Sequence, residues 1–442
     1  MMKETILQFG TGKFLRAFFD AFVETLNKQG LYAGRVVIVS PTDSKAVETI
    51  NAQNGVYHLI ERGVAHAENV CRQSTITCVS RAVNPYRAFE AFLALAANPD
   101  LRFIVSNTTE AGIRYDPACR PDDRPAASFP GKLTQFLFAR YQLGLRGLII
   151  LPCELIDDNG RALEHCVRRY AEQWQLGDGF LSWLKTENRF CSTLVDRIVT
   201  GFPAQEAETI FEALGTRDAL LDTAEPYHLW VIEGNFENEL PLQAGGCNVI
   251  WTDNVAPFKK MKVRILNGAH TSLVFPSLLC GLETVGDSLG DALMNEYLNV
   301  CLFGYILPTL GETEENRAFA NAVLERFRNP FLRHLWQSIS LNSVSKFTTR
   351  VLPTITDYIA MHGTLPKPLV FSLACLIRYY RENDPADEAA AVRCIQTQTV
   401  PAVLSNAALW GRDLSCMAPL VTDSLQRMEQ YGIREAIRWS IS

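Results

Sequence analysis

The stretch Thr5-Ile-Leu-Gln-Phe-Gly-Thr-Gly12 decides the expected fold of the N-terminal half of this chain. Residues 5–9 read as a short buried strand, and two glycines follow it closely. Apolar residues then recur with helical period over 14–26, and a second strand is expected at 36–39. In such a strand–helix–strand unit the first glycine permits a tight turn, and the second lets the backbone approach a pyrophosphate. The stretch therefore predicts a dinucleotide-binding unit.

This glycine motif departs from the usual fingerprint at two points. The third glycine is absent, because Phe14, Leu15 and Arg16 stand where it would come. An acidic residue that would bind the ribose of NAD is also missing at the end of the second strand. Asp43 follows one turn late and reads equally well as a ribose ligand or as an ordinary turn residue. Since no arginine stands there for a 2′-phosphate either, this loop leaves NAD and NADP open.

Strand and helix patterns alternate beyond this unit. Such alternation implies a mostly parallel sheet that is covered by helices on both faces. A more mixed region follows over 177–253. We expect strands at 57–60, 75–79, 103–106, 148–151, 229–232 and 249–251, and helices at 86–97, 131–143, 161–176 and 192–199.

The pattern changes after Pro257, where the remaining sequence reads almost wholly as helices. A chain of 442 residues is too long for one ordinary hydrophobic core. The sequence therefore predicts an α/β protein with two domains. Residues 1–252 would form a Rossmann-type, mostly parallel sheet domain, and residues 253–442 a mainly α-helical substrate-binding and catalytic domain. Asn254 or Asp253 is expected to cap the first helix of the second domain.

The composition argues against several functional classes. Hydrophobic residues make up 48% of the chain and charged residues 20%, and the net charge of −6 argues against an extended nucleic-acid surface. The twelve cysteines contain no C-x-x-C pair and the seven histidines no H-E-x-x-H motif, so free thiols and no metal site are expected. No secretion signal or long apolar run is present, so we expect a cytoplasmic location and no membrane partner.

A second motif, Lys262-Val-Arg-Ile-Leu-Asn267-Gly-Ala-His270, opens the helical region. On a regular α-helix its amine, carboxamide and imidazole fall within an arc of about 140°, so they can point into one cavity. A buried lysine is suited to general acid/base chemistry, because desolvation lowers its pKa toward neutrality. The alternative is a solvated polar face of the helix. The apolar residues that lie between the three polar ones favour burial.

The two motifs together resemble those of the long-chain polyol dehydrogenases, the mannitol dehydrogenase family. That family joins a G-x-G-x-x-x-R cofactor motif, here Gly10 to Arg16, to a K-x5-N-x2-H motif, here Lys262 to His270. The resemblance covers most of the chain and implies a two-domain dehydrogenase. Runs that resemble the family members acting on keto sugar acids lie at 106–112, 152–156, 190–201, 265–271 and 326–330.

The resemblance also implies roles for individual residues. Lys262 would be the catalytic acid/base, with Asn267 and His270 as catalytic partners that polarise and position the reacting oxygen. NAD would be the cofactor. Its expected contacts are Phe9, Gly10, Thr11, Gly12, Lys13, Phe14, Leu15, Arg16 and Asn107.

Three further residues are candidates for substrate binding. Family members that act on sugar alcohols carry a second asparagine donor at the position of Ser192, so a two-amide oxyanion site is in doubt here. A sugar acid also needs a cation for its carboxylate, and Lys346 and Arg350 are the candidates. The alternative for these two is a solvated basic turn of helix. Arg264 is less suited, since it lies far around the helix from Lys262.

These expectations describe an NAD-dependent reductase that interconverts D-tagaturonate and D-altronate by hydride transfer, with its oligomeric state left open. Reactions on fructuronate and mannonate, or on mannitol and fructose, are the alternatives among enzymes. A nucleotide-sensing regulator without turnover is the alternative outside them. Retention of Lys262, Asn267 and His270 argues against such a regulator.

Overall fold

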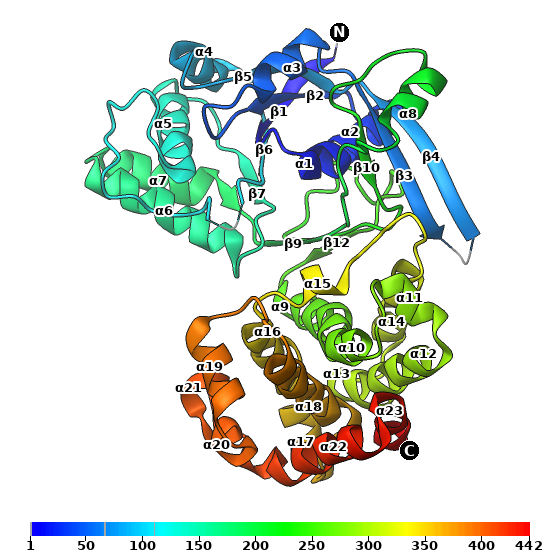
Figure 1. Cartoon of the computed structure of the whole chain (residues 1–442). Helices are drawn as coiled ribbons and strands as arrows, with labels where there is room; N and C mark the ends of the chain where they lie inside the picture. Colours follow the sequence, from blue (N-terminus) through cyan, green and yellow to red (C-terminus); the bar gives the residue numbers. More distant parts are fainter. Residues whose placement is uncertain (1, 66–67, 110) are drawn as a thin grey trace. The chain divides into compact units, whose positions relative to one another are not determined.

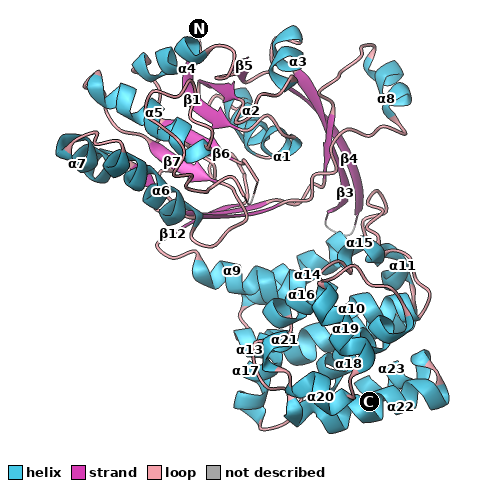
Figure 2. Cartoon of the chain, turned by 60° about the vertical axis from the view of Figure 1, so that its left-hand side comes forward, coloured by secondary structure: helices cyan, strands magenta, loops and turns pink. Residues whose placement is uncertain are grey.

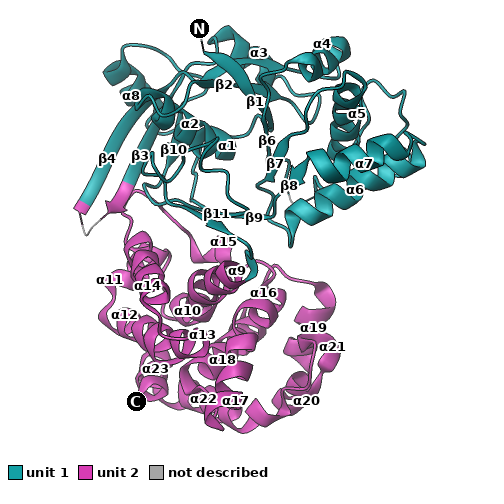
Figure 3. Cartoon of the chain, turned by 180° about the vertical axis from the view of Figure 1, so that it is seen from behind, with its two compact units in different colours: residues 1–62, 69–256 teal, residues 63–68, 257–442 magenta. Residues whose placement is uncertain are grey.

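Strand β1 (Lys3–Phe9) belongs to a six-stranded sheet in the computed structural model of the chain, which describes residues 2–65, 68–109 and 111–442 (Figure 1). Glu110, within the run 106–112, lies outside the described residues. The chain divides into two compact units (Figure 3). The first comprises Met1–Arg62 and Asn69–Ala256, and the second comprises Gly63–Glu68 and Pro257–Ser442.

The order of the strands in this sheet reverses next to β1. On one side Leu7 of β1 lies opposite Val37 of β2 (Gly34–Val39), and on the other it lies opposite Ile104 of β6 (Phe103–Ser106). All of the strand pairs in the sheet are parallel, which confirms the predicted Rossmann-type sheet. The order is β5-β2-β1-β6-β7-β8, with β5 at Val79–Val83, β7 at Ile149–Pro152 and β8 at Arg189–Phe190.

The helices beside this sheet (Figure 2) pack against it through two hydrophobic cores. Successive residues of β1 point to opposite faces, so that Ile6 packs in the core of α2 and Leu7 in the core of α5. The helical period of 14–26 is interrupted at Phe18, whose backbone (φ −115°, ψ −79°) separates two helices. The main helices of this unit are α1 (Lys13–Ala17), α2 (Phe19–Lys28), α3 (Ala46–Ala52), α4 (Phe89–Ala94), α5 (Phe129–Gln142), α6 (Asn159–Gln173), α7 (Asp178–Glu187) and α8 (Ala207–Leu214).

Two small three-stranded sheets complete the β structure. One has the order β10-β3-β4, with β10 at Asp222–Ala224, β3 at Tyr57–Ala65 and β4 at Glu68–Ile76. The other has the order β12-β11-β9, with β12 at Val249–Thr252, β11 at Leu229–Glu233 and β9 at Thr193–Asp196.

Two of the local predictions are wrong. The helix expected at 192–199 is strand β9, which pairs antiparallel with β11 so that Val195 lies opposite Trp230. β-Branched residues fit a pleated surface well, and pairing with a distant strand outweighs the weak helical period here. The single strand expected at 75–79 is divided, because β4 ends at Ile76 and β5 begins at Val79.

The second unit is mainly helical, as predicted. Helices α10 (Gly268–Leu279) and α18 (Lys367–Glu382) have most of their residues buried and pack against each other. The other helices and π-helical turns are α9 (Ala256–Lys262), η2 (Val263–Asn267), α11 (Val285–Gly290), α12 (Ala292–Asn299), η3 (Val300–Ile306), α13 (Leu307–Leu310), α14 (Glu314–Phe327), α15 (Trp336–Ile339), α16 (Ser343–Arg350), α17 (Leu352–His362), α19 (Ala389–Thr397), α20 (Val400–Ser405), α21 (Ala407–Trp410), α22 (Ala418–Tyr431) and α23 (Ile433–Ile441).

Within the described ranges, no helix is long and apolar enough to cross a membrane. Across the same residues, no three histidine, cysteine, aspartate or glutamate side chains gather closely enough to hold a metal ion.

Candidate active site

The glycine turn after β1 has the geometry that its sequence predicts. Gly10 has a φ of +140°, and a Cβ atom added to it would lie 2.9 Å from the carbonyl oxygen of Asn107. Only glycine therefore fits this position without strain. A Cβ added to Gly12 would meet nothing within 4 Å, so the backbone there faces open space immediately before α1. This open backbone fits the pyrophosphate of a dinucleotide.

The other residues expected to bind the cofactor fall into two groups. The side chains of Phe9 and Leu15 are buried in the hydrophobic cores, and Phe14 stacks on Phe18 with ring centroids 4.9 Å apart. Phe9 and Leu15 can therefore offer only their backbone to a ligand, whereas the side chain of Phe14 is partly exposed. Lys13 extends along the surface, where its Nζ donates to the carbonyl of Thr200 at 3.2 Å.

Arg16 turns beneath the glycine turn instead of into solvent. Its Nη2 lies 3.3 Å from Oδ2 of Asp222, and its guanidinium lies 5.7 Å from the ring centre of Tyr57. Asp222 is the first residue of β10, so Arg16 joins α1 to the neighbouring small sheet. The structure thus places the Arg16 side chain between α1 and the small sheet, where it is paired with Asp222.

A buried carboxylate that sequence reasoning missed holds the loop after β6. Glu154 accepts hydrogen bonds from Ser106 Oγ (3.0 Å) and from the N–H and hydroxyl of Thr108 (both 2.9 Å). Burial raises the pKa of Glu154, and the Thr108 donors oppose that rise. Asn107, the remaining cofactor candidate, donates its amide to the carbonyl of Cys153 at 2.8 Å. Its place two residues after β7, within the run 152–156, was the signal that could have identified Glu154.

A cavity opens beside this loop. Doubly wound sheets bind ligands where the strand order reverses, at the carboxyl ends of the strands, and this cavity lies in that position. Its walls come from the ends of β2 and β6 and from the start of α5, and they include Pro41, Thr42, Thr108, Thr109, Ser128 and Phe129.

The Lys262 motif does not lie on a regular α-helix, which corrects the geometry assumed from its sequence. Asn254 Oδ1 accepts a hydrogen bond from Ala256 N–H (3.0 Å) at the start of α9, as expected for a cap. After Lys262 the helix widens into η2, where the N–H of Gly268 bonds to the carbonyl of Val263, five residues back. Such a turn is wider than an α-helical one, so residues five apart are separated by a smaller angle, and Lys262 and Asn267 come closer to one side.

Neighbouring helices hold this π turn in place. Arg264 is buried and donates to Thr354 Oγ1 (2.9 Å) and Asp357 Oδ2 (3.1 Å) on α17, so it is not available to a substrate. On α16, the carbonyl oxygen of Arg350 lies 3.1 Å from the place that a Cβ of Gly268 would occupy. Glycine at 268 therefore permits the close approach of the helix that carries Lys346 and Arg350.

His270 is buried among aromatic rings. It stacks on Phe327 with centroids 4.1 Å apart, and meets His334 and Trp336 edge-on at 5.2 and 6.3 Å. Its Nε2 has no hydrogen-bond partner among the described residues. Burial lowers the pKa of His270 well below its usual value, so the imidazole is neutral at physiological pH.

Neighbouring basic groups lower the pKa of His270 further. These are His334, Arg326, Arg350 and Lys346, in decreasing order of effect. Lys346 donates from Nζ to the carbonyl of Ile339 at 2.8 Å, and burial lowers the pKa of both Lys346 and Arg350. Sequence reasoning identified Lys346 and Arg350 but missed Arg326 and His334. The run 326–330 contained the signal for Arg326.

Ser192, in the first unit, precedes β9 directly. Its backbone N–H lies 3.3 Å from Oε2 of Glu233, and a Cβ on Gly160 would come within 2.5 Å of that nitrogen. The Ser192 hydroxyl is buried and has no hydrogen-bond partner in the described part of the chain.

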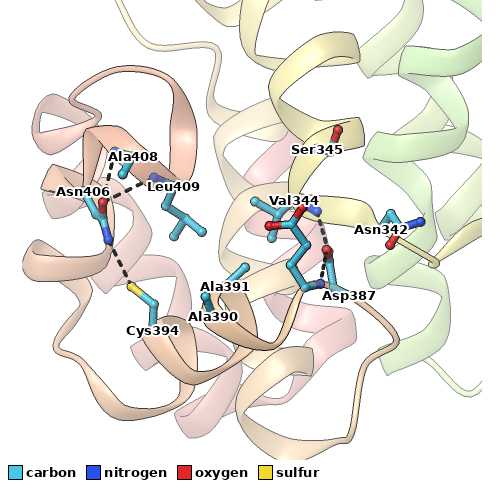
Figure 4. Close-up of a pocket in the computed structure, with 11 residues that line it drawn as sticks. Asn342, Val344, Ser345, Asp387, Ala390, Ala391, Cys394, Asn406, Ala408 and Leu409 are labelled. Atoms are coloured by element: carbon cyan, nitrogen blue, oxygen red, sulfur yellow. Dashed lines mark hydrogen bonds between the residues drawn. The ribbon is translucent and has the colours of Figure 1, made fainter. Parts of the chain in front are cut away.

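A second cavity, in the helical unit, contains none of the candidate site residues (Figure 4). Asp387 accepts from the N–H of Val344 at 2.9 Å, and Asn406 accepts from the N–H of Ala408 at 3.1 Å. Asn406 also donates to Cys394 Sγ at 3.4 Å. Asp387 and Asn406 thus accept hydrogen bonds from backbone groups at the starts of helices, and we assign no catalytic role to this cavity.

Each of the two units matches a domain of the same protein family. Residues 4–244 match the mannitol dehydrogenase Rossmann domain, and residues 254–431 match the mannitol dehydrogenase C-terminal domain. Among curated proteins, the altronate oxidoreductase of Halalkalibacterium halodurans is 40% identical, with 99% of this chain and 93% of that protein covered. The altronate oxidoreductase of Pectobacterium atrosepticum is 42% identical, with 98% and 96% covered.

Solved structures show the same fold. D-Sorbitol dehydrogenase in substrate-free form superposes with a TM-score of 0.86 at 22% identity, covering 99% of this chain and 95% of that one. The Pseudomonas fluorescens mannitol 2-dehydrogenase complex with NAD and D-mannitol superposes with a TM-score of 0.72 at 19% identity, covering 99% and 94%.

The close approach at Gly268 generates a stability prediction. Alanine is the better helix former by about 0.5–1 kcal/mol, but a Cβ at 268 crowds the Arg350 carbonyl, and overpacking costs about 1–3 kcal/mol. We expect Gly268→Ala to lower the melting temperature measured by calorimetry. Gly304→Ala is the matched control, since Gly304 lies in the other π turn, η3, where an added Cβ meets nothing within 4 Å. Equal melting temperatures for the two variants would contradict this account of the contact.

Proposed function

The chain belongs to the mannitol dehydrogenase family, and on that basis we propose that it is an NAD-dependent oxidoreductase that interconverts D-tagaturonate and D-altronate. The observation that carries this proposal is the identity of 40% and 42% to altronate oxidoreductases over nearly the whole chain. Reactions on fructuronate or on mannitol remain within the chemistry of the family, but these relatives favour altronate.

The glycine turn supports a nicotinamide dinucleotide as the cofactor, which when bound supplies or accepts the hydride. Asp43, just beyond β2, favours NAD over NADP. It accepts hydrogen bonds from Asn84 (2.9 Å) and Arg87 (3.0 Å), which lower its pKa and keep it ionised. A carboxylate there can accept from the ribose hydroxyls of NAD and repels the 2′-phosphate of NADP. Arg87 also pairs with Glu48, so it is already engaged by two carboxylates.

Lys262 is the proposed acid/base. As an ammonium it would donate a proton to the oxygen of the reacting carbonyl, and as a neutral amine it would remove that proton in the reverse reaction. Asn267, the last residue of the π turn, would donate to the developing oxyanion, an interaction worth about 3 kcal/mol. The neutral His270, whose Nε2 has no partner among the described residues, is suited to a hydrogen bond with a substrate oxygen.

The substrate carboxylate requires a cation, and Lys346 and Arg350 are proposed to supply it. They lie four residues apart on α16, and each affects the pKa of His270. An incoming carboxylate would offset the cost of keeping two partly buried cations close together. Ser192 would contribute a hydroxyl donor where relatives acting on sugar alcohols carry an amide.

The cysteines favour a reducing compartment. All twelve are free thiols, and most of them are buried. Free thiols persist in the cytosol, where disulfides rarely form, so we propose that the protein works in the cytoplasm.

Removal of the Lys262 amine tests the acid/base role. We expect Lys262→Ala to lower the turnover of tagaturonate by about 10²–10⁴-fold, the usual range for general acid/base catalysis, while NADH binding stays intact. The measurement is NADH oxidation, with fluorescence titration for cofactor affinity. Lys260→Ala is the control on the same helix, because Lys260 makes only a half-exposed pair with Asp357 at 3.6 Å. Retained turnover in the Lys262 variant would remove the assignment.

Removal of the Lys346 charge tests the carboxylate site. Lys346→Met keeps most of the aliphatic stem and loses the ammonium, and a hydrogen bond to a charged group is worth about 1.5–3 kcal/mol. We therefore expect KM for tagaturonate to rise by about 10–100-fold, with a much smaller rise for a neutral ketose. Equal changes for both substrates would show that Lys346 serves the fold and not the carboxylate.

A further inference from the structure

A fully buried carboxyl group lies beneath the glycine turn. Asp20 stands in the first turn of α2, and no basic side chain of the described residues lies within ion-pair distance of it. The nearest cation, Arg16, is paired with Asp222 instead. Asp20 therefore has no counter-charge of its own, and a buried carboxylate in that position is costly.

The hydroxyl of Tyr57 joins Asp20 to α1, directly after the glycine turn. Its oxygen lies 2.9 Å from Oδ2 of Asp20 and 2.9 Å from the backbone carbonyl of Arg16. A tyrosine hydroxyl has one hydrogen, so it can donate to only one of these oxygens at a time. If Asp20 were ionised, both oxygens could only accept, and one of the two contacts would lack a hydrogen.

A proton on Asp20 supplies the missing hydrogen. The carboxyl group then donates to Tyr57, and Tyr57 donates to the carbonyl of Arg16, so both contacts of 2.9 Å are hydrogen bonds. Gln8 lowers the pKa of Asp20, and its Nε2 lies 3.3 Å from the carbonyl of Gly10, but Asp20 Oδ1 and Gln8 Oε1 have no hydrogen-bond partner among the described residues.

We propose that Asp20 is a positioning residue for the cofactor, which holds a hydrogen and thereby fixes α1, directly after the glycine turn, through Tyr57 and the carbonyl of Arg16. This inference rests on the proposed binding of a nicotinamide dinucleotide at that turn. Asp20 is not expected to touch the cofactor.

The groups that face Asp20 set the pH range of the effect. Burial raises the pKa of Asp20 to about 7, the Tyr57 hydrogen bond, Arg16 and Gln8 oppose the rise, and Glu24 on the next turn of α2 adds to it. The thiol of Cys78 donates to the backbone carbonyl of Asp20, not to its carboxyl group. Asp20 therefore loses its hydrogen as the pH rises through neutrality.

Ionisation of Asp20 should weaken cofactor binding for two reasons. The Tyr57 hydrogen turns to the carboxylate, and the carbonyl of Arg16 loses its donor. A negative charge also appears beneath a turn that binds a pyrophosphate. The protonated form thus binds the cofactor more tightly, and by linkage the dissociation constant rises with pH above the pKa.

The experiment is a fluorescence titration of the full-length protein with NADH, without substrate, at a series of pH values on both sides of neutrality. For the natural protein we expect a constant affinity at low pH and a loss of about tenfold two units above the pKa. In Asp20→Asn the amide donates to Tyr57 at every pH, so this variant should bind NADH as tightly as the protonated protein, with no pH dependence.

Two further variants make the test specific. Asp222→Asn should keep the loss of affinity above neutrality, since burial raises the pKa of Asp222 only to about 6. Tyr57→Phe breaks the chain of hydrogen bonds, and should bind NADH more weakly at low pH with little further loss at high pH. If Asp20→Asn fails to fold, two other measurements test whether protonation of Asp20 strengthens NADH binding. These are the pH dependence of Tyr57→Phe and the proton uptake on NADH binding, measured by calorimetry in two buffers.

Several results would overturn the inference. These are a pH dependence that persists in Asp20→Asn or disappears in Asp222→Asn, weak binding by Asp20→Asn at every pH, or no proton uptake near neutrality. The proposed function survives each of these results, because NADH still binds. Failure of NADH to bind at any pH would instead refute the proposed cofactor, and with it the premise of this inference.

Discussion

The hydrogen bond from the N–H of Gly268 to the carbonyl of Val263 is the constraint on which the candidate active site depends. It spans five residues where an α-helix spans four, so one extra residue is accommodated between Lys262 and His270. On a regular helix Lys262 and Asn267 would point about 140° apart, and the wider turn brings them toward the same side. Other helices preserve the turn, because α17 holds the Arg264 side chain and α16 approaches Gly268 closely.

Buried carboxyl groups have a comparable structural role near the glycine turn after β1. Glu154 holds the loop after β6 through Ser106 and Thr108, and Asp20 contacts Tyr57, which reaches the carbonyl of Arg16 just beyond the loop after β1. These two loops flank the point where the strand order reverses. A ligand that binds backbone atoms needs those atoms fixed in advance, and buried hydrogen bonds fix them more firmly than exposed ones. If the cofactor binds as proposed, the acids would contribute to binding by positioning the backbone, without facing the ligand.

Much of the fold follows from local sequence patterns, and much of the site does not. Strand β1, the turn at Gly10 and the change to helices after Pro257 are visible because each depends on neighbouring residues. Strand β9 was mistaken for a helix because its pairing with β11 lies far along the chain. The π turn was missed because one extra residue barely disturbs helical periodicity. Asp20 and Glu154 look like surface acids in the sequence, since their partners Tyr57 and Thr108 are 37 and 46 residues away.

The charges near His270 determine how the chemistry is divided among the site residues. Burial and four basic groups keep the imidazole neutral, so it is suited to hydrogen bonding and poorly suited to supplying a proton. We propose that Lys262 supplies the proton instead. The positive potential that disfavours an imidazolium also stabilises an anion, whether a carboxylate of the substrate or an oxyanion that forms during hydride transfer. Although the chain carries a net charge of −6, the local arrangement of Arg326, Lys346 and Arg350 is therefore suited to a negatively charged sugar acid.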